Sequence, residues 1–77
     1  VSLTPGGASS IVTQGLPCAG ARVVAALWAR LADRPGPVPA HARNEACTVE
    51  ARVYDLSVVH CQAGPIDVGF VWRSPAA

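Results

Sequence analysis

The sequence predicts a small α+β domain in which one amphipathic helix packs on a short antiparallel sheet. Three observations lead to this prediction. The chain has only 77 residues, the length of one domain. One stretch repeats its apolar residues with a helical period, and the C-terminal half alternates apolar and polar residues as strands do. We therefore expect a single domain with the element order (β)-α-β-β-β, flanked by loose termini at residues 1–9 and 74–77.

The helix is expected over residues 20–33. Strong helix formers fill this segment, and Pro17 just before it is compatible with a helix start. Apolar residues recur on one stripe, which consists of Gly20, Val24, Leu27, Trp28 and Leu31. We expect Leu27, Trp28 and Leu31 to be buried against the sheet. The Pro-Gly-Pro sequence at 35–37 should end the helix.

Three strands are expected in the C-terminal half, and a shorter one at 10–14 before the helix. Residues 47–53 alternate, with the odd-numbered positions on one face. Residues 56–61 form a second β-branched run, and residues 62–65 have the composition of a hairpin connection. The clearest strand follows, with one face made of Ile66, Val68, Phe70 and Trp72. We expect that face to meet the helix, since neither element can bury its apolar side alone.

The composition excludes several classes of function. Hydrophobic residues make up 51% of the chain and charged residues 14%, which argues against disorder. A net charge of +1 argues against a nucleic-acid partner, because phosphate binding needs a dense cationic face. No apolar run approaches the length of a transmembrane segment, and no glycine-rich phosphate loop is present, so we expect neither a membrane span nor a cofactor. All basic residues are arginine and methionine is absent, which is typical of a high-GC bacterial genome such as an actinobacterium's.

The cysteines and the first residue indicate export. The chain begins with Val1, as expected of a mature product after signal cleavage or of a fragment of a longer protein. Its cysteines, Cys18, Cys47 and Cys61, are odd in number. One disulfide and one free thiol in an oxidising compartment is the simplest interpretation, and three buried thiols in a reducing cytosol is the alternative. We expect a secreted or cell-envelope protein, whose leftover thiol is either buried or links two chains in a dimer.

We expect the disulfide to involve Cys18, with Cys18–Cys61 and Cys18–Cys47 ranked almost equally. Either bridge would join the helix start to the sheet. A Cys47–Cys61 bridge ranks lower, because it requires the chain to reverse near Tyr54-Asp55. On one continuous strand these two residues would lie roughly 45 Å apart, against about 6 Å between the Cα atoms of a disulfide.

Catalysis and metal binding are not indicated. Structural zinc usually shows a Cys-x-x-Cys or His-x-x-x-His spacing, and neither occurs here. His60 and Cys61 are adjacent, so on a strand they point to opposite faces and cannot act together. His41 is expected in a solvated loop and His60 on an exposed strand face. So short a chain also leaves little room for a substrate pocket, and we expect a protein that is not an enzyme and holds no metal.

One segment resembles the reactive loop of Kazal-type serine protease inhibitors. Residues 46–52 read Ala-Cys-Thr-Val-Glu-Ala-Arg, and in that family Cys-Thr precedes the residue that enters the protease pocket, with Glu following it. The resemblance implies that Val49 sets specificity and that Val49–Glu50 is the scissile bond. It implies an elastase-like or subtilisin-like target with a small pocket. The six-cysteine pattern of the Kazal family is absent.

A second resemblance is to the Streptomyces subtilisin-inhibitor family. Those proteins also place a helix after a cysteine, a cysteine near the reactive loop, and then a Val-Tyr-Asp-type stretch. Here the order is Cys18 and the helix, then Cys47, then residues 53–55. This chain is shorter than the members of that family, and it has three cysteines where they have two pairs.

The function expected from the sequence is that of a small exported, non-catalytic protein-binding domain, with a secreted serine protease inhibitor as the alternative. The candidate binding residues are Thr48, Val49, Glu50 and Arg52. The inhibitor requires a protruding loop around Val49. The binding domain requires the same residues in a hydrogen-bonded strand pair.

Overall fold

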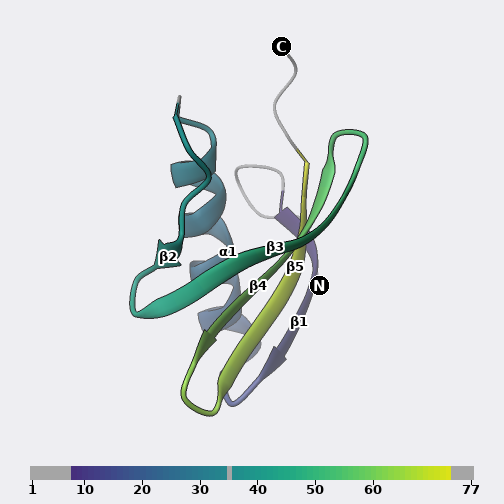
Figure 1. The fold of residues 1–77 in the computed structure, drawn as a ribbon. Coiled ribbons are helices and arrows are strands. Elements are labelled where there is room, and N and C mark those ends of the chain that lie inside the picture. Colours follow the sequence, from purple (N-terminus) through teal and green to yellow (C-terminus); the bar gives the residue numbers. More distant parts are fainter. Residues whose placement is uncertain (1–7, 35, 74–77) are drawn as a thin grey trace.

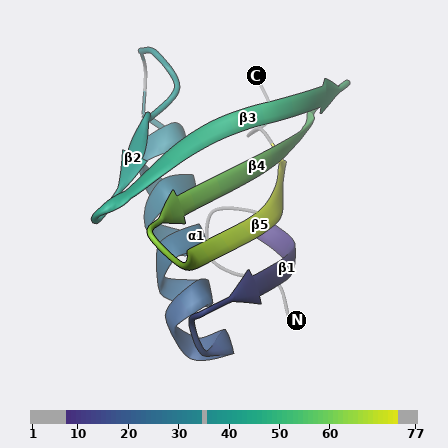
Figure 2. The same cartoon turned by 60° about the horizontal axis from the view of Figure 1, so that its bottom comes forward.

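The computed structural model describes residues 8–34 and 36–73, which form a five-stranded antiparallel sheet with one helix on one face (Figure 1). The elements are β1 (Ala8–Gln14), α1 (Cys18–Ala32), β2 (His41–Ala42), β3 (Glu45–Val53), β4 (Leu56–Ala63) and β5 (Ile66–Arg73). The strands lie in the order β1-β5-β4-β3-β2 (Figure 2). The predicted α+β class is confirmed. The two-residue strand β2 is an addition, and β1 includes Ala8 and Ser9, which we had assigned to a loose terminus. The rest of the two expected loose ends lies outside the described residues.

The core is built around Trp28 of α1. Its ring meets Phe70 and Trp72 of β5 edge to face, with ring centroids 5.6 and 5.2 Å apart. Its indole Nε1 donates a hydrogen bond to the carbonyl oxygen of Pro39, 3.1 Å away, so the polar atom of this buried side chain is satisfied. The predicted inner face of the last strand is confirmed, with Val68, Phe70 and Trp72 buried and Ile66 packed at the margin.

The buried face of the helix is rotated from the predicted stripe, with which it shares Val24 and Trp28. Trp28 is buried as expected, but Leu27 and Leu31 are only half-buried, and the fully buried helix residues are Ala21, Val24, Ala25, Trp28 and Ala29. Alanine side chains allow the helix to approach the sheet closely enough for Trp28 to reach β5. The larger leucines then lie at the margin of the contact, and the prediction that Leu27 and Leu31 are core residues is wrong.

The connection from β1 to α1 depends on a glycine. Gly15 has φ +77°, and a Cβ there would lie 2.8 Å from the carbonyl oxygen of Pro65 in the β4–β5 turn. Only glycine tolerates both the backbone conformation and this close approach. Thr13 Oγ1 also donates a hydrogen bond to the carbonyl oxygen of Leu16, which holds the same connection.

The disulfide joins Cys47 to Cys61, not Cys18 to either of them. The chain reverses at Tyr54-Asp55, so β3 and β4 form a hairpin in which Cys47 and Cys61 are direct neighbours, with Cα atoms 4.0 Å apart. The bridge lies on the inner face of the sheet, where Cys61 is fully buried. Cys18 is the first residue of α1 and is exposed with a free thiol. The predicted pairing is wrong because the reversal that we considered unlikely takes place.

Candidate interaction surface on the open sheet face

The helix covers one face of the sheet, and the other face, which we call the open face, carries the candidate site. The side chains along β4 alternate between the two faces of the sheet. Those of Ser57, Val59 and Cys61 are buried on the face that the helix covers. Val58 and His60 therefore point to the open face. On β5 the same alternation places Asp67 and Val71 there.

Apolar side chains gather on the hairpin half of the open face. Val53 and Leu56 are paired directly across the β3–β4 hairpin, and Val58 lies two residues further along, opposite Val71 of β5. Val53 is 60% exposed, and Leu56 and Val58 are exposed as well. We call Val53, Leu56 and Val58 the apolar strip. Grouped apolar side chains of this kind mark interaction sites more often than isolated ones do.

The turn of the hairpin presents a tyrosine. Tyr54 is 96% exposed and adopts φ +54°, a conformation that two-residue hairpin turns usually give to Gly, Asn or Asp. The tip lies at the end of the sheet away from the helix in both views (Figures 1 and 2). A fully exposed aromatic ring beside the apolar strip gives the surface a residue type that dominates protein–protein interfaces.

At the other end of the open face, His60 lies between two carboxylates. Its Nδ1 atom is 2.9 Å from Asp67 Oδ1 on β5 and 3.5 Å from Glu50 Oε1 on β3. Glu50 lies at the irregularity between Val49 and Ala51, where β3 has one residue more than β4. Asp67 Oδ1 is itself buried and accepts no hydrogen bond of good geometry despite its short contact with the imidazole.

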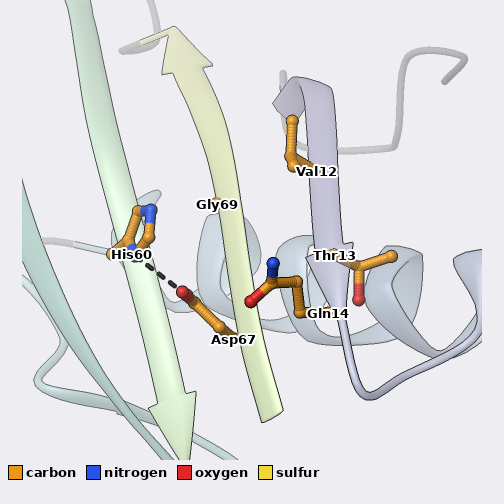
Figure 3. A pocket seen from close by; sticks show the side chains of 6 residues that line it. All are labelled: Val12, Thr13, Gln14, His60, Asp67 and Gly69. Carbon is orange, nitrogen blue, oxygen red and sulfur yellow. Dashed lines mark ion pairs between the residues drawn. The ribbon is translucent and has the colours of Figure 1, made fainter.

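A hollow of about 170 Å³ opens beside His60 (Figure 3). Six residues of β1, β4 and β5 line it: Val12, Thr13, Gln14, His60, Asp67 and Gly69. A second hollow of about 270 Å³ adjoins it, shares Val12, His60 and Gly69, and reaches Val58 of the apolar strip. The two hollows thus connect the polar end of the open face with the apolar end.

The residues predicted to form a reactive loop lie in a strand. The segment 46–52 belongs to β3 and pairs with β4, with Thr48 opposite His60 and Val49 opposite Val59. Val49 is half-buried and packs against the core, while Glu50 and Arg52 are exposed. Of the four candidate binding residues, the structure brings only Thr48 and Glu50 next to the His60 cluster.

The irregularity in β3 also changes which side chains face inward. We expected Val53 on the same face as Cys47 and Val49, but one extra residue shifts the alternation, and Val53 is paired with Leu56 on the open face. Sequence reasoning missed the apolar strip for this reason. The sequence analysis also treated Tyr54 as part of a turn and His60 as an isolated polar residue. Asp67 on the next strand was a signal of a cross-strand pair with His60.

A separate ion pair stabilises the turn between β2 and β3. The Arg43 guanidinium donates two hydrogen bonds of 3.2 Å to the Glu45 carboxylate, which is almost completely buried. This carboxylate raises the pKa of Arg43, through the hydrogen bonds first and through its charge second. The pair lies away from the open face and serves the turn, where Arg43 has φ +57°.

Comparison of the chain with protein-family models, curated proteins and solved structures finds no match. Within residues 8–34 and 36–73, no helix has the length and apolar character needed to cross a lipid bilayer. The same residues contain no group of three or more His, Cys, Asp or Glu side chains arranged to hold a metal ion.

Proposed function

We propose that this chain is a small exported domain that binds a protein partner and does not catalyse a reaction. The observation that supports the proposal is the open face, which presents the apolar strip, the Tyr54 tip and a charged cluster around His60 on one continuous surface. Interfaces combine these features, namely an apolar centre, an aromatic anchor and a polar margin.

The disulfide supports the exported part of the proposal. Disulfides form and persist in oxidising compartments and are rare in the cytosol of most organisms. The Cys47–Cys61 bridge crosses the β3–β4 hairpin, whose turn carries Tyr54. It therefore stiffens the element that presents the surface, which lowers the ordering cost of binding.

Site-specific photo-crosslinking tests the proposal. A photoreactive phenylalanine analogue is placed at Val58 on the open face or at Val23, an exposed residue on the outer side of the helix, and each protein is exposed to the extracellular and envelope fractions of its source. We expect a discrete protein adduct from position 58 that position 23 does not form. Equal adducts at both positions, or none at position 58, would contradict the proposal.

A further inference from the structure

The open face changes in character along β4. The outward positions are Leu56 and Val58 at the hairpin end and then His60, which lies against Glu50 and Asp67. Leu56 and His60 are four residues apart on one strand, so the apolar end and the acidic end are separated by about 13 Å. A partner that covers the face must match both ends at this distance.

The acidic end has an unbalanced charge. Two carboxylates face the His60 imidazole, one from β3 and one from β5, while β1 contributes the uncharged Thr13 and Gln14. Even a protonated imidazole offsets only one of the two negative charges. The exposed arginines at Arg22, Arg30 and Arg34 lie on or just after α1, on the other side of the sheet. The two carboxylates around His60 therefore give this end of the open face a local excess of negative charge, although the net charge of the chain is +1.

The hollow beside His60 is suited to a cationic side chain. It offers the Asp67 carboxylate and the Gln14 amide oxygen as acceptors, and its remaining wall includes the exposed Val12 side chain, which can contact the aliphatic stem of a lysine or arginine. Asp67 Oδ1 is buried 2.9 Å from His60 Nδ1, so a cation would approach the remaining part of the Asp67 side chain, which is 31% exposed. A cation beside Asp67 and Glu50 would compensate the excess negative charge.

We propose that the open face binds a segment of a partner protein that presents apolar side chains to the apolar strip and one arginine or lysine to the hollow beside His60. The inference rests on the proposed function and specifies the chemistry of the partner. The charge around His60 excludes an anionic membrane surface, which would be repelled. It also disfavours a second copy of this chain whose two-fold axis passes near His60, because the same two carboxylates would then oppose each other.

Selection of peptides from a random twelve-residue phage library on the immobilised 77-residue chain tests the proposal. We expect the enriched peptides to carry an arginine or lysine a few residues from a pair of apolar residues. Their affinity should fall about tenfold when the chain carries the near-isosteric pair Glu50→Gln and Asp67→Asn, because a partly desolvated ion pair contributes on that scale. It should also fall with Val58→Glu but not with the matched control Val23→Glu on the helix. Circular dichroism of each variant establishes that it is folded.

The possible results separate the inference from the proposed function. The enriched peptides could lose affinity with Val58→Glu and yet lack a basic residue, or bind the variant with Glu50→Gln and Asp67→Asn unchanged. Either result would overturn the inference and leave the proposed function standing. Enriched peptides that bind all variants equally, or a library from which nothing is enriched, would overturn both. A chain that is dimeric by sedimentation without peptide, and becomes monomeric with Val58→Glu, would identify a second copy as the occupant and overturn the inference.

Discussion

The His60 imidazole lies directly across from Gly69 on the open face, at the pair where β4 meets β5. A Cβ at Gly69 would lie 3.0 Å from Nε2 and 3.1 Å from Cδ2 of the imidazole. The ring therefore occupies the space that a side chain on β5 would otherwise fill. An aromatic ring over a cross-strand glycine shields backbone that would otherwise be exposed. The contact with Gly69 also holds the His60 ring between Asp67 and Glu50. Gly69 therefore positions the side chain at the polar end of the open face.

We predict that Gly69→Ala and His60→Ala are energetically coupled. Alanine suits a strand better than glycine does, so Gly69→Ala should stabilise the chain when His60 is also replaced by alanine. With His60 present, the added methyl group displaces the imidazole, and the gain should be lost. The double-mutant cycle should give a coupling free energy of about 0.5 to 1 kcal/mol, measured by urea unfolding. Strict additivity would show that the ring does not rest on Gly69 in solution.

The disulfide should stabilise the chain substantially, and Cys18 should not matter to stability. Replacing Cys47 and Cys61 together by serine opens a loop closed over a sequence separation of 14. In the chain-entropy model a loop of this size contributes about 3 kcal/mol to the free energy of unfolding. Cys18→Ser is the matched control and should change stability by less than about 0.5 kcal/mol, because the residue is exposed. Alkylation of the denatured, unreduced protein should label one thiol, and a label count of three would refute the bridge.

The pairing could not be obtained from the sequence because it depends on a turn that the sequence does not mark. A two-residue hairpin turn is usually recognised by Asn-Gly or Asp-Gly. Here the turn is Tyr54-Asp55, and the positive φ falls on the tyrosine. The candidate site was missed for a different reason, because the extra residue between Val49 and Ala51 of β3 turns Val53 to the open face.

The helix shows what sequence periodicity does and does not determine. Its presence, approximate limits and the burial of Trp28 were predicted correctly from the spacing of apolar residues. Its rotation was wrong because the prediction gave weight to large side chains, Leu27 and Leu31, and little to Ala21 and Ala25. Close approach of a helix to a sheet favours small residues at the centre of the contact, and hydrophobicity alone does not reveal that.

Two substitutions on the helix test this rotation. Ala25→Asp places an unpaired charge in the fully buried face, at a position outside the predicted stripe, and should prevent folding at 25 °C, since an uncompensated buried charge costs several kcal/mol. Leu31→Asp lies at the half-buried margin and should leave a folded protein that is less stable by about 1 to 2 kcal/mol. Thermal unfolding by circular dichroism distinguishes the two. If Leu31→Asp unfolds the protein and Ala25→Asp does not, the predicted stripe is correct and the observed rotation is not.

The Arg43–Glu45 pair should be needed for the β2–β3 turn. Arg43→Ala leaves the buried Glu45 carboxylate without its donor and should lower stability, whereas Arg43→Lys keeps the charge but loses the two-pronged contact and should be intermediate. Adding Glu45→Gln to Arg43→Ala should recover part of the loss. Glu45 raises the pKa of Arg43. The Arg43 guanidinium therefore makes its full contribution to the stability of the fold at any pH below the pKa that arginine has in the unfolded chain. The loss on Arg43→Ala should therefore not vanish as the pH rises from 7 to 10, and a loss that disappears over this interval would contradict the assignment.

Titration against serine proteases tests the resemblance of residues 46–52 to inhibitor reactive loops. A protease binds such a loop in an extended and protruding form, but the Val49–Glu50 bond lies within β3, and Val49 packs against the core beside Val59. To present this bond, the chain would have to release part of the β3–β4 pairing, which the Cys47–Cys61 disulfide restrains. We therefore expect subtilisin-like and elastase-like proteases to retain full activity at micromolar concentrations of the chain. Inhibition at such concentrations that is lost with Val49→Asp, while a Tyr54→Ala control remains inhibitory, would show that the strand opens and that the inhibitor alternative is correct.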